Sequence, residues 1–200
     1  SQAKAKKLER YLTVPEQMSG IFLKDGKIAI LSDRTGTSQV WEYDTDDSFL
    51  VQRTNLKNRV WRIMPGPTRD GIFFASDMDG NENEQIYYLG EGGEPLRLTH
   101  GDMARYFFAG ATKDLQWVRL ASNARDAAHF DIVQINTETQ EVDLVIENND
   151  HYNIPRCLSP DGRYMLTNKL RAQSDNPLYL VGFETREQRP LIPDAPKAAY

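Results

Sequence analysis

Cysteine and long apolar runs are nearly absent from this chain. Cys157 is its only cysteine, which excludes an intrachain disulfide and a cysteine-based metal cluster. No apolar run approaches the about 20 residues that a membrane-spanning helix needs. The net charge of −5 argues against a nucleic-acid binder, because such proteins usually carry a basic face. We therefore expect no cofactor, and neither nucleic acid nor membrane as a partner.

Motifs that carry chemistry are missing as well. His100, His129 and His151 stand too far apart for a paired metal motif such as His-x-x-x-His. A Gly-x-Ser-x-Gly nucleophile elbow is also absent, since the nearest string, Gly36-Thr37-Ser38-Gln39-Val40, lacks the second glycine. We therefore predict that these residues contain no catalytic residue of their own.

A polar turn followed by a short apolar run occurs repeatedly in the chain. The turn Ser159-Pro160-Asp161-Gly162-Arg163 leads into Tyr164-Met165-Leu166. Asp-Gly favours a tight turn, because glycine adopts positive φ and Asp can bond its own backbone. The same combination occurs at three further places: at residues 24–26 before 27–31, at 69–71 before 72–75, and at 113–114 before 115–120.

A second run of aromatic and aliphatic residues follows each turn unit and gives the repeat a period. These runs begin at residues 39, 85, 131 and 177, so each step is 46 residues. A fixed period of about 20–50 residues is typical of repeat architectures, and a unit of four short strands is a propeller blade. We therefore predict an all-β fold, a partial and open β-propeller of about four blades, each a four-stranded antiparallel sheet.

The period divides the chain into segments. Residues 1–19 are expected to form an N-terminal lead-in, and residues 20–193 to form blades at about 20–54, 60–99, 104–147 and 152–193. Residues 194–200 resemble the start of a truncated continuation. Because four blades rarely close a ring, the terminal blades should expose apolar faces. Self-association through these open blades is therefore expected.

Charged loops between the second and third strands of each blade are the candidate contact surface. Equivalent loops of successive blades should lie on one face of a propeller, so their charges should form one rim. Arg34, Arg125 and Arg171 are the candidate rim contacts, because arginine can bind a carboxylate through two parallel hydrogen bonds. The alternative, that these loops are ordinary solvated surface, stays open.

The string Asp77-x-Asp79-x-Asn81 resembles the first half of a calcium-binding loop. Glu82 stands where such a loop needs glycine, and Tyr88 stands where it needs an acid. We therefore favour a turn whose side chains accept hydrogen bonds from backbone N–H groups, and keep the three residues only as weak metal candidates.

Trp41, Trp61 and Trp117 are the tryptophans of the chain. Together on a surface they would suggest a stacking platform for sugars or bases. Trp41 and Trp117 fall inside expected strands of different blades, which favours packing in the core.

At several motifs the chain resembles the N-terminal β-propeller of the prolyl oligopeptidase family of serine peptidases. The nearest branch is that of acylaminoacyl-peptidase and dipeptidyl-peptidase-like members. The resemblance covers about residues 20–193 and is carried by residues 75–81, 85–89, 92–99 and 158–163. TolB-like propellers use the same Ser-Pro-Asp-Gly and Leu-Tyr elements and are the second choice.

The resemblance implies a propeller that caps an α/β-hydrolase domain of the same parent protein, admits peptide substrates and excludes folded proteins. Catalysis would belong to that domain, so the parent would be a serine peptidase and this chain its non-catalytic propeller. Two alternatives stay open: a TolB-like protein-interaction propeller, and, less favoured, a propeller enzyme such as a metal-dependent lyase. We expect a cytoplasmic protein and leave a secreted or periplasmic location open.

Overall fold

The structure is a computed structural model that describes residues 15–150, 152–170 and 176–192. These ranges contain sixteen β-strands, one short 3-10 turn, η1 (Lys24–Gly26), and no α-helix. None of their helical residues forms a segment long and apolar enough to cross a membrane. Most of the expected lead-in, the segment 194–200 and Arg171 lie outside the described residues.

Strands that follow one another in sequence pair antiparallel, so the chain forms four separate meanders, which we call blades 1 to 4. Blade 1 comprises β1 (Gln17–Phe22), β2 (Ile28–Ser32), β3 (Gln39–Asp44) and β4 (Phe49–Gln52). Blade 2 comprises β5 (Val60–Pro65), β6 (Gly71–Ser76), β7 (Gln85–Gly90) and β8 (Leu96–Arg97). Blade 3 comprises β9 (Tyr106–Ala111), β10 (Trp117–Asp126), β11 (His129–Asn136) and β12 (Val142–Ile146). Blade 4 comprises β13 (Tyr152–Leu158), β14 (Tyr164–Leu170), β15 (Leu178–Gly182) and β16 (Glu187–Pro190).

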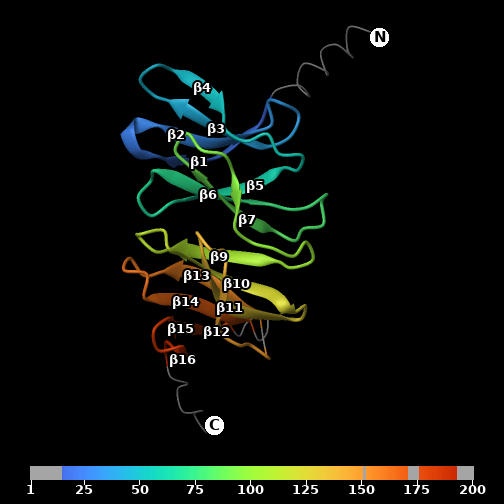
Figure 1. Ribbon diagram of the computed structural model, residues 1–200, viewed down its shortest axis with the longest axis vertical. Coiled ribbons are helices and arrows are strands. Elements are labelled where there is room, and N and C mark those ends of the chain that lie inside the picture. Colours follow the sequence, from blue (N-terminus) through green and yellow to red (C-terminus); the bar gives the residue numbers. More distant parts are fainter. Residues whose placement is uncertain (1–14, 151, 171–175, 193–200) are drawn as a thin grey trace, which may run out of the picture.

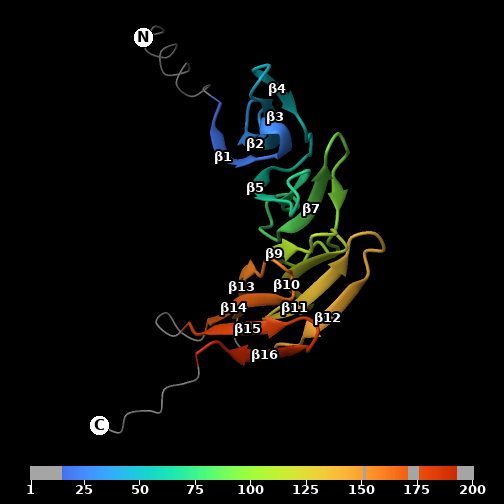
Figure 2. The same ribbon diagram turned by 90° about the vertical axis from the view of Figure 1, so that its left-hand side faces the viewer.

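The four blades are stacked in sequence order, from blade 1 in blue to blade 4 in red (Figure 1). Their first strands, β1, β5, β9 and β13, lie along one side of the stack (Figure 2), and we call them the inner strands. Blades 1 and 4 stand at opposite ends of the stack and do not pair with each other. The described chain is therefore a partial, open β-propeller, as its period predicts.

The strands alternate in direction, which gives the stack two distinct faces. The β2–β3, β6–β7 and β10–β11 loops share one end of the strands with the connections between blades, and we call this end the loop face. The opposite end carries the β1–β2, β5–β6, β9–β10 and β13–β14 turns, and we call it the hairpin face. Equivalent loops therefore gather on one face, as a propeller requires.

Several strand ends differ from those predicted. β1 begins at Gln17, inside the expected lead-in, because this residue pairs with Ser32. β10 begins after Leu115, whose φ of 58° places it in the left-handed turn before the strand. β8 ends before Thr99, because the Thr99 hydroxyl accepts the hydrogen bond of the Ile86 amide at 2.9 Å in place of a backbone carbonyl.

The apolar core lies between successive blades. Side chains along one strand point alternately to opposite faces of its sheet, so β6 directs Phe74 towards blade 1 and Phe73 towards blade 3. Both faces of blade 2 are thus covered, and all six residues of β6 are buried. Between blades 3 and 4, the buried set comprises Ala121, Phe130, Ile132, Val145, Met165, Val181 and Phe183.

A buried arginine also stands between blades 3 and 4. Arg119 in β10 is 8% exposed, and its guanidinium carbon lies 3.6 Å from the centroid of the Phe183 ring. Burial lowers the pKa of Arg119 to about 10, while the carboxylates of Asp114, Glu184 and Asp161 favour its charged form. Because these neighbouring groups are acidic, the surroundings of Arg119 disfavour a bound anion.

Hairpins between the third and fourth strands repeat one backbone conformation in three of the blades. Ser48, Gln140 and Arg186 have φ values of 53°, 60° and 54°, and they are separated by 92 and 46 residues. Left-handed conformations are uncommon for residues other than glycine. Their recurrence at multiples of the sequence period shows that the repeat extends to the turns.

Buried polar side chains at the start of the third strands hold the connections between blades. The Gln85 amide in β7 donates to the Ala104 carbonyl at 2.7 Å, and its side-chain oxygen accepts from the Thr99 hydroxyl at 2.9 Å. Gln39 makes the corresponding bonds in blade 1, and Asp131 accepts a backbone N–H bond of 2.8 Å in blade 3. The side chains that begin the runs 46 residues apart therefore fasten each blade to the next connection.

Replacing Ser48 by glycine is expected to stabilise the protein. Glycine adopts the left-handed conformation without the steric strain of a β-carbon, so Ser48→Gly should raise the free energy of unfolding by about 0.5–1 kcal/mol, measured by urea denaturation. Ser48→Ala keeps the strain and serves as the control. Equal stabilities of the glycine and alanine variants would show that this turn is not strained.

Gln85→Leu is expected to destabilise the chain by about 1–3 kcal/mol, because buried hydrogen-bonding groups such as the Ala104 carbonyl lose their partner. Gln116, which is exposed, provides the matched control, and Gln116→Leu should change stability by less than about 0.5 kcal/mol. The measurement is the urea midpoint of both variants. Equal midpoints would contradict the role of Gln85 in holding the connection.

Candidate functional site

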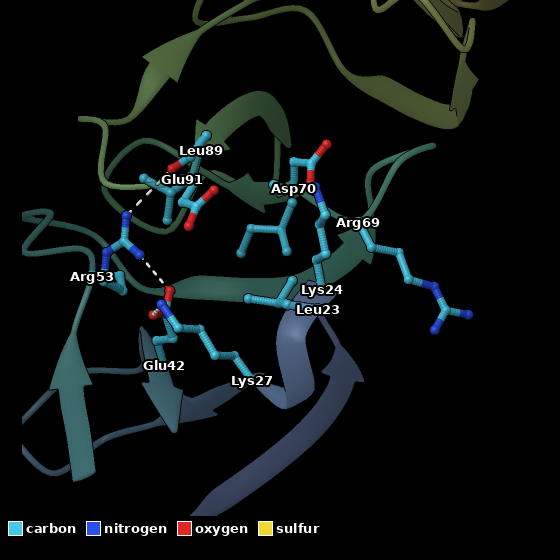
Figure 3. A pocket seen from close by; sticks show the side chains of 12 residues that line it. Leu23, Lys24, Lys27, Glu42, Arg53, Arg69, Asp70, Leu89 and Glu91 are labelled. Carbon is cyan, nitrogen blue, oxygen red and sulfur yellow. Dashed lines mark hydrogen bonds and ion pairs between the residues drawn. The ribbon is translucent and has the colours of Figure 1, made fainter. Parts of the chain in front are cut away.

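A cleft between blades 1 and 2 opens on the hairpin face, and Figure 3 shows the side chains that line it. Basic and acidic groups alternate there. Lys27 Nζ lies 3.0 Å from Glu42 Oε1, and the Arg53 guanidinium donates to the other oxygen of the same carboxylate. Lys24 Nζ lies 3.2 Å from Asp70 Oδ1. Glu42 and Asp70 are therefore each paired with basic residues of this chain.

The pKa shifts in this cleft follow from these ion pairs. The hydrogen bond to Glu42 raises the pKa of Lys27, and the bond from Lys24 lowers the pKa of Asp70. Both shifts favour the charged forms at neutral pH. The space left in the cleft is about 30 Å³, roughly the volume of one water molecule. The cleft is therefore an electrostatic contact between blades and offers no room for a substrate.

The three arginines expected on the rim have different surroundings. Arg34 is exposed in the β2–β3 loop. Arg125 donates two hydrogen bonds, of 2.7 and 2.9 Å, to the carboxylate of Asp131, which raises the pKa of Arg125. Asp131 is only 2% exposed, so Arg125 uses its paired donors on a buried carboxylate of its own chain. Arg171 lies outside the described residues.

The weak metal candidates in the β6–β7 loop have partners within the chain. Asp77 is buried and accepts the Glu82 amide bond at 3.0 Å, while Asp79 pairs with Lys57 at 2.8 Å. The Asn81 side chain accepts a backbone N–H bond of 3.0 Å. These contacts form an Asx-rich turn. In the described part of the chain, no three His, Cys, Asp or Glu side chains converge as a metal ion would require.

Each inner strand contains a one-residue bulge, which the sequence does not predict. The extra residues, which have no partner on the neighbouring strand, are Ser19, Trp61, Ala109 and Arg156. A bulge bends its strand and redirects a side chain, and bulges are frequent beside functional sites. Trp61 is 39% exposed at its bulge. It is therefore not the core residue that a tryptophan in a strand would ordinarily be.

A hollow of about 160 Å³ lies beside this bulge, between residues of blades 2 and 3. It is lined by Trp61, Glu82, Glu84 and Arg105. The guanidinium carbon of Arg59 lies 3.0 Å from the centroid of the Trp61 ring. Glu84 Oε2 lies 2.6 Å from Arg62 Nη2, whereas Glu84 Oε1 lies 3.9 Å from Arg105 Nη2. Aromatic, acidic and basic groups thus meet in one space near the inner strands.

A sequence signal for this hollow exists in the repeat. Arg59 and Arg105 are 46 residues apart, and each stands two residues before an aromatic side chain, Trp61 or Phe107. The pattern Arg-x-aromatic therefore recurs with the period of the fold at the start of two inner strands. It is hidden among many other charged residues, and the bulge that exposes Trp61 has no sequence signature.

Solved structures resemble this chain over most of its length. A prolyl endopeptidase gives a TM-score of 0.72 at 14% identity, covering 96% of this chain and 31% of that one. Dipeptidyl peptidase 4 of Porphyromonas gingivalis gives 0.68 at 13% identity, covering 89% and 26%. TolB from Acinetobacter baumannii gives 0.59 at 18% identity, covering 84% and 41%. The shared feature is the β-propeller fold.

These likenesses show the fold alone, because the identities are low. No family model matches the chain, and no curated protein matches it in sequence. The chain spans 31%, 26% and 41% of the three structures named above. The functions of those whole proteins can therefore be attributed to this chain only as a proposal.

Proposed function

We propose that the chain is a non-catalytic propeller segment of a prolyl-oligopeptidase-type serine peptidase. It gates or orients peptide substrates for an α/β-hydrolase domain of the parent protein. The observation that carries the proposal is the hollow beside Trp61, where side chains of two blades surround a space of about 160 Å³ near the inner strands. The fold likeness to a prolyl endopeptidase and to dipeptidyl peptidase 4 supports it, although a fold by itself does not fix a function.

Uncovered apolar faces at both ends of the stack support a place in a larger propeller. Ile28, Ile30 and Leu50 line a hollow of about 410 Å³ on blade 1. Leu166 and Leu180 line one of about 430 Å³ on blade 4. Within the chain, sheet faces of this kind are covered by the next blade. In the parent these end faces would take further blades, and in the isolated chain they would take a second copy.

A TolB-like protein-interaction propeller is the alternative. The likeness to TolB is consistent with this function. A propeller lyase has a fold likeness of the same kind, since an oligogalacturonate lyase from Vibrio parahaemolyticus gives a TM-score of 0.56 at 13% identity, but the described residues hold no cluster of side chains that could bind a metal ion.

The proposed function is tested with the purified chain and two kinds of ligand. Acyl-amino-acid and dipeptide chromogenic substrates should not be turned over, since no nucleophile elbow is present. Short blocked peptides should shift the Trp61 indole signal in NMR spectra, and Trp61→Leu should identify that signal. Turnover would contradict a non-catalytic chain. Failure of every peptide to bind would contradict peptide handling and leave the TolB-like alternative.

The isolated chain is expected to self-associate as its concentration rises, because the end faces are apolar and open. Sedimentation velocity over a wide concentration range measures this. Leu166→Gln and Ile30→Gln should each weaken the association, whereas Leu56→Gln, away from both end faces, provides a control for general destabilisation. A monomer at every concentration would contradict the proposed role of the end faces.

A further inference from the structure

An apolar residue at one position of the third strands meets the following blade at every interface within the chain. Val40, Ile86 and Ile132 occupy this position in blades 1, 2 and 3 and stand 46 residues apart. Each is at most 1% exposed, and each belongs to the apolar cluster that its blade shares with the following blade. We call the sheet face that carries this position the forward face of a blade.

A second position, three residues further along the same strands, meets the preceding blade. Leu89, Ile135 and Val181 occupy it in blades 2, 3 and 4 and again stand 46 residues apart. Each is at most 3% exposed, and each belongs to the cluster that its blade shares with the preceding blade. We call the sheet face that carries this position the backward face. Every interface between blades in the described part of the chain therefore joins a forward face to a backward face.

Each series has one more member, and that member lies on an end face of the stack (Figure 1). The forward position of blade 4 is Leu178, which is 38% exposed. Leu180 lies on the same face, two residues further along β15, and lines the hollow of about 430 Å³. The backward position of blade 1 is Tyr43, which lines the hollow of about 410 Å³ together with its strand partner Ile28. The stack thus ends in one open forward face and one open backward face.

We propose that two copies of this chain associate head to tail, with the forward face of blade 4 of one copy on the backward face of blade 1 of the other. Leu178 and Tyr43 then share an apolar cluster, as Ile132 and Val181 do between blades 3 and 4. Two different patches meet, so the contact is heterologous. The inference does not depend on peptide handling, and it adds to the expected self-association the identity of the faces that meet.

The test uses two variants of the full chain, each with one end face blocked by a charge. Leu178→Glu blocks the forward face of blade 4, and Ile28→Glu blocks the backward face of blade 1, because burial of an unpaired charge is strongly unfavourable. Each variant alone has lost one of the two faces that every head-to-tail contact needs. Its dissociation constant should therefore rise at least about tenfold in sedimentation velocity runs, relative to the unaltered chain.

An equal mixture of the two variants should associate again. The Ile28→Glu copy keeps an intact forward face, the Leu178→Glu copy keeps an intact backward face, and these two faces form one contact. The mixture should therefore give a dimer with one copy of each variant that does not grow further. Recovery of this dimer also shows that both variants are folded, and circular dichroism of each variant checks this separately.

Val142→Glu provides the matched control. Val142 is an exposed apolar residue of β12 in blade 3, at 54% exposure, and blade 3 stands at neither end of the stack. This variant should associate as the unaltered chain does. Loss of association in Val142→Glu would show that added charge acts generally, and it would overturn the assignment to the end faces.

The remaining outcomes separate the possible contacts. Association of Leu178→Glu alone would mean that two blade 1 faces meet, and association of Ile28→Glu alone would mean that two blade 4 faces meet. Either result would overturn the inference, as would a mixture that stays monomeric while the unaltered chain associates. An unaltered chain that is monomeric at every concentration would overturn the expected self-association as well. Peptide binding is measured separately and decides the proposed function alone.

Discussion

Each sheet in this chain has two faces that must be covered, and no sheet can cover its own. A strand sends alternate side chains to opposite faces, so β6 serves two interfaces at once, with Phe74 in one and Phe73 in the other. The stability of blade 2 therefore depends on both of its neighbours. Repeat proteins in which units contact only their neighbours share this property. In this chain, the outer sheet faces of blades 1 and 4 have no neighbouring blade to cover them.

The same dependence explains why polar residues recur with the period. Two blades can stack at a fixed spacing only if the connection between them reaches the next inner strand at a fixed position. The side chain of Gln85 fixes this position through its hydrogen bond to the connection, and the side chain of Gln39 does the same one repeat earlier. Because the connection leads directly into an inner strand, its last residues reach equivalent positions in successive blades. Arg59 and Arg105 are such residues, so the packing constraint also places Arg105 at the hollow beside Trp61.

The parts of the fold that the sequence predicts are those fixed by packing between blades. The period of 46 residues is visible because each interface needs the same kinds of side chain in the same order. Strand ends are less predictable where a side chain replaces a backbone partner, as the Thr99 hydroxyl does at the end of β8. The ion pair of Arg125 with Asp131 is also not predictable from the sequence, because the sequence does not show that Asp131 is buried. The hollow beside Trp61 depends on a bulge, and a bulge leaves no sequence pattern.

Bulges in the inner strands connect the fold to its proposed use. An inner strand is a sheet edge with unpaired backbone groups, and such an edge readily pairs with another extended chain. A bulge interrupts the regular row of donors and acceptors, and all four inner strands have one, at Ser19, Trp61, Ala109 and Arg156. Under the proposed function, a peptide near these strands would be discouraged from adding to a sheet and would have to be recognised by side chains. Trp61 is itself the extra residue of such a bulge, and its side chain lines the hollow. The bulge that protects the strand edge thus also forms part of the hollow.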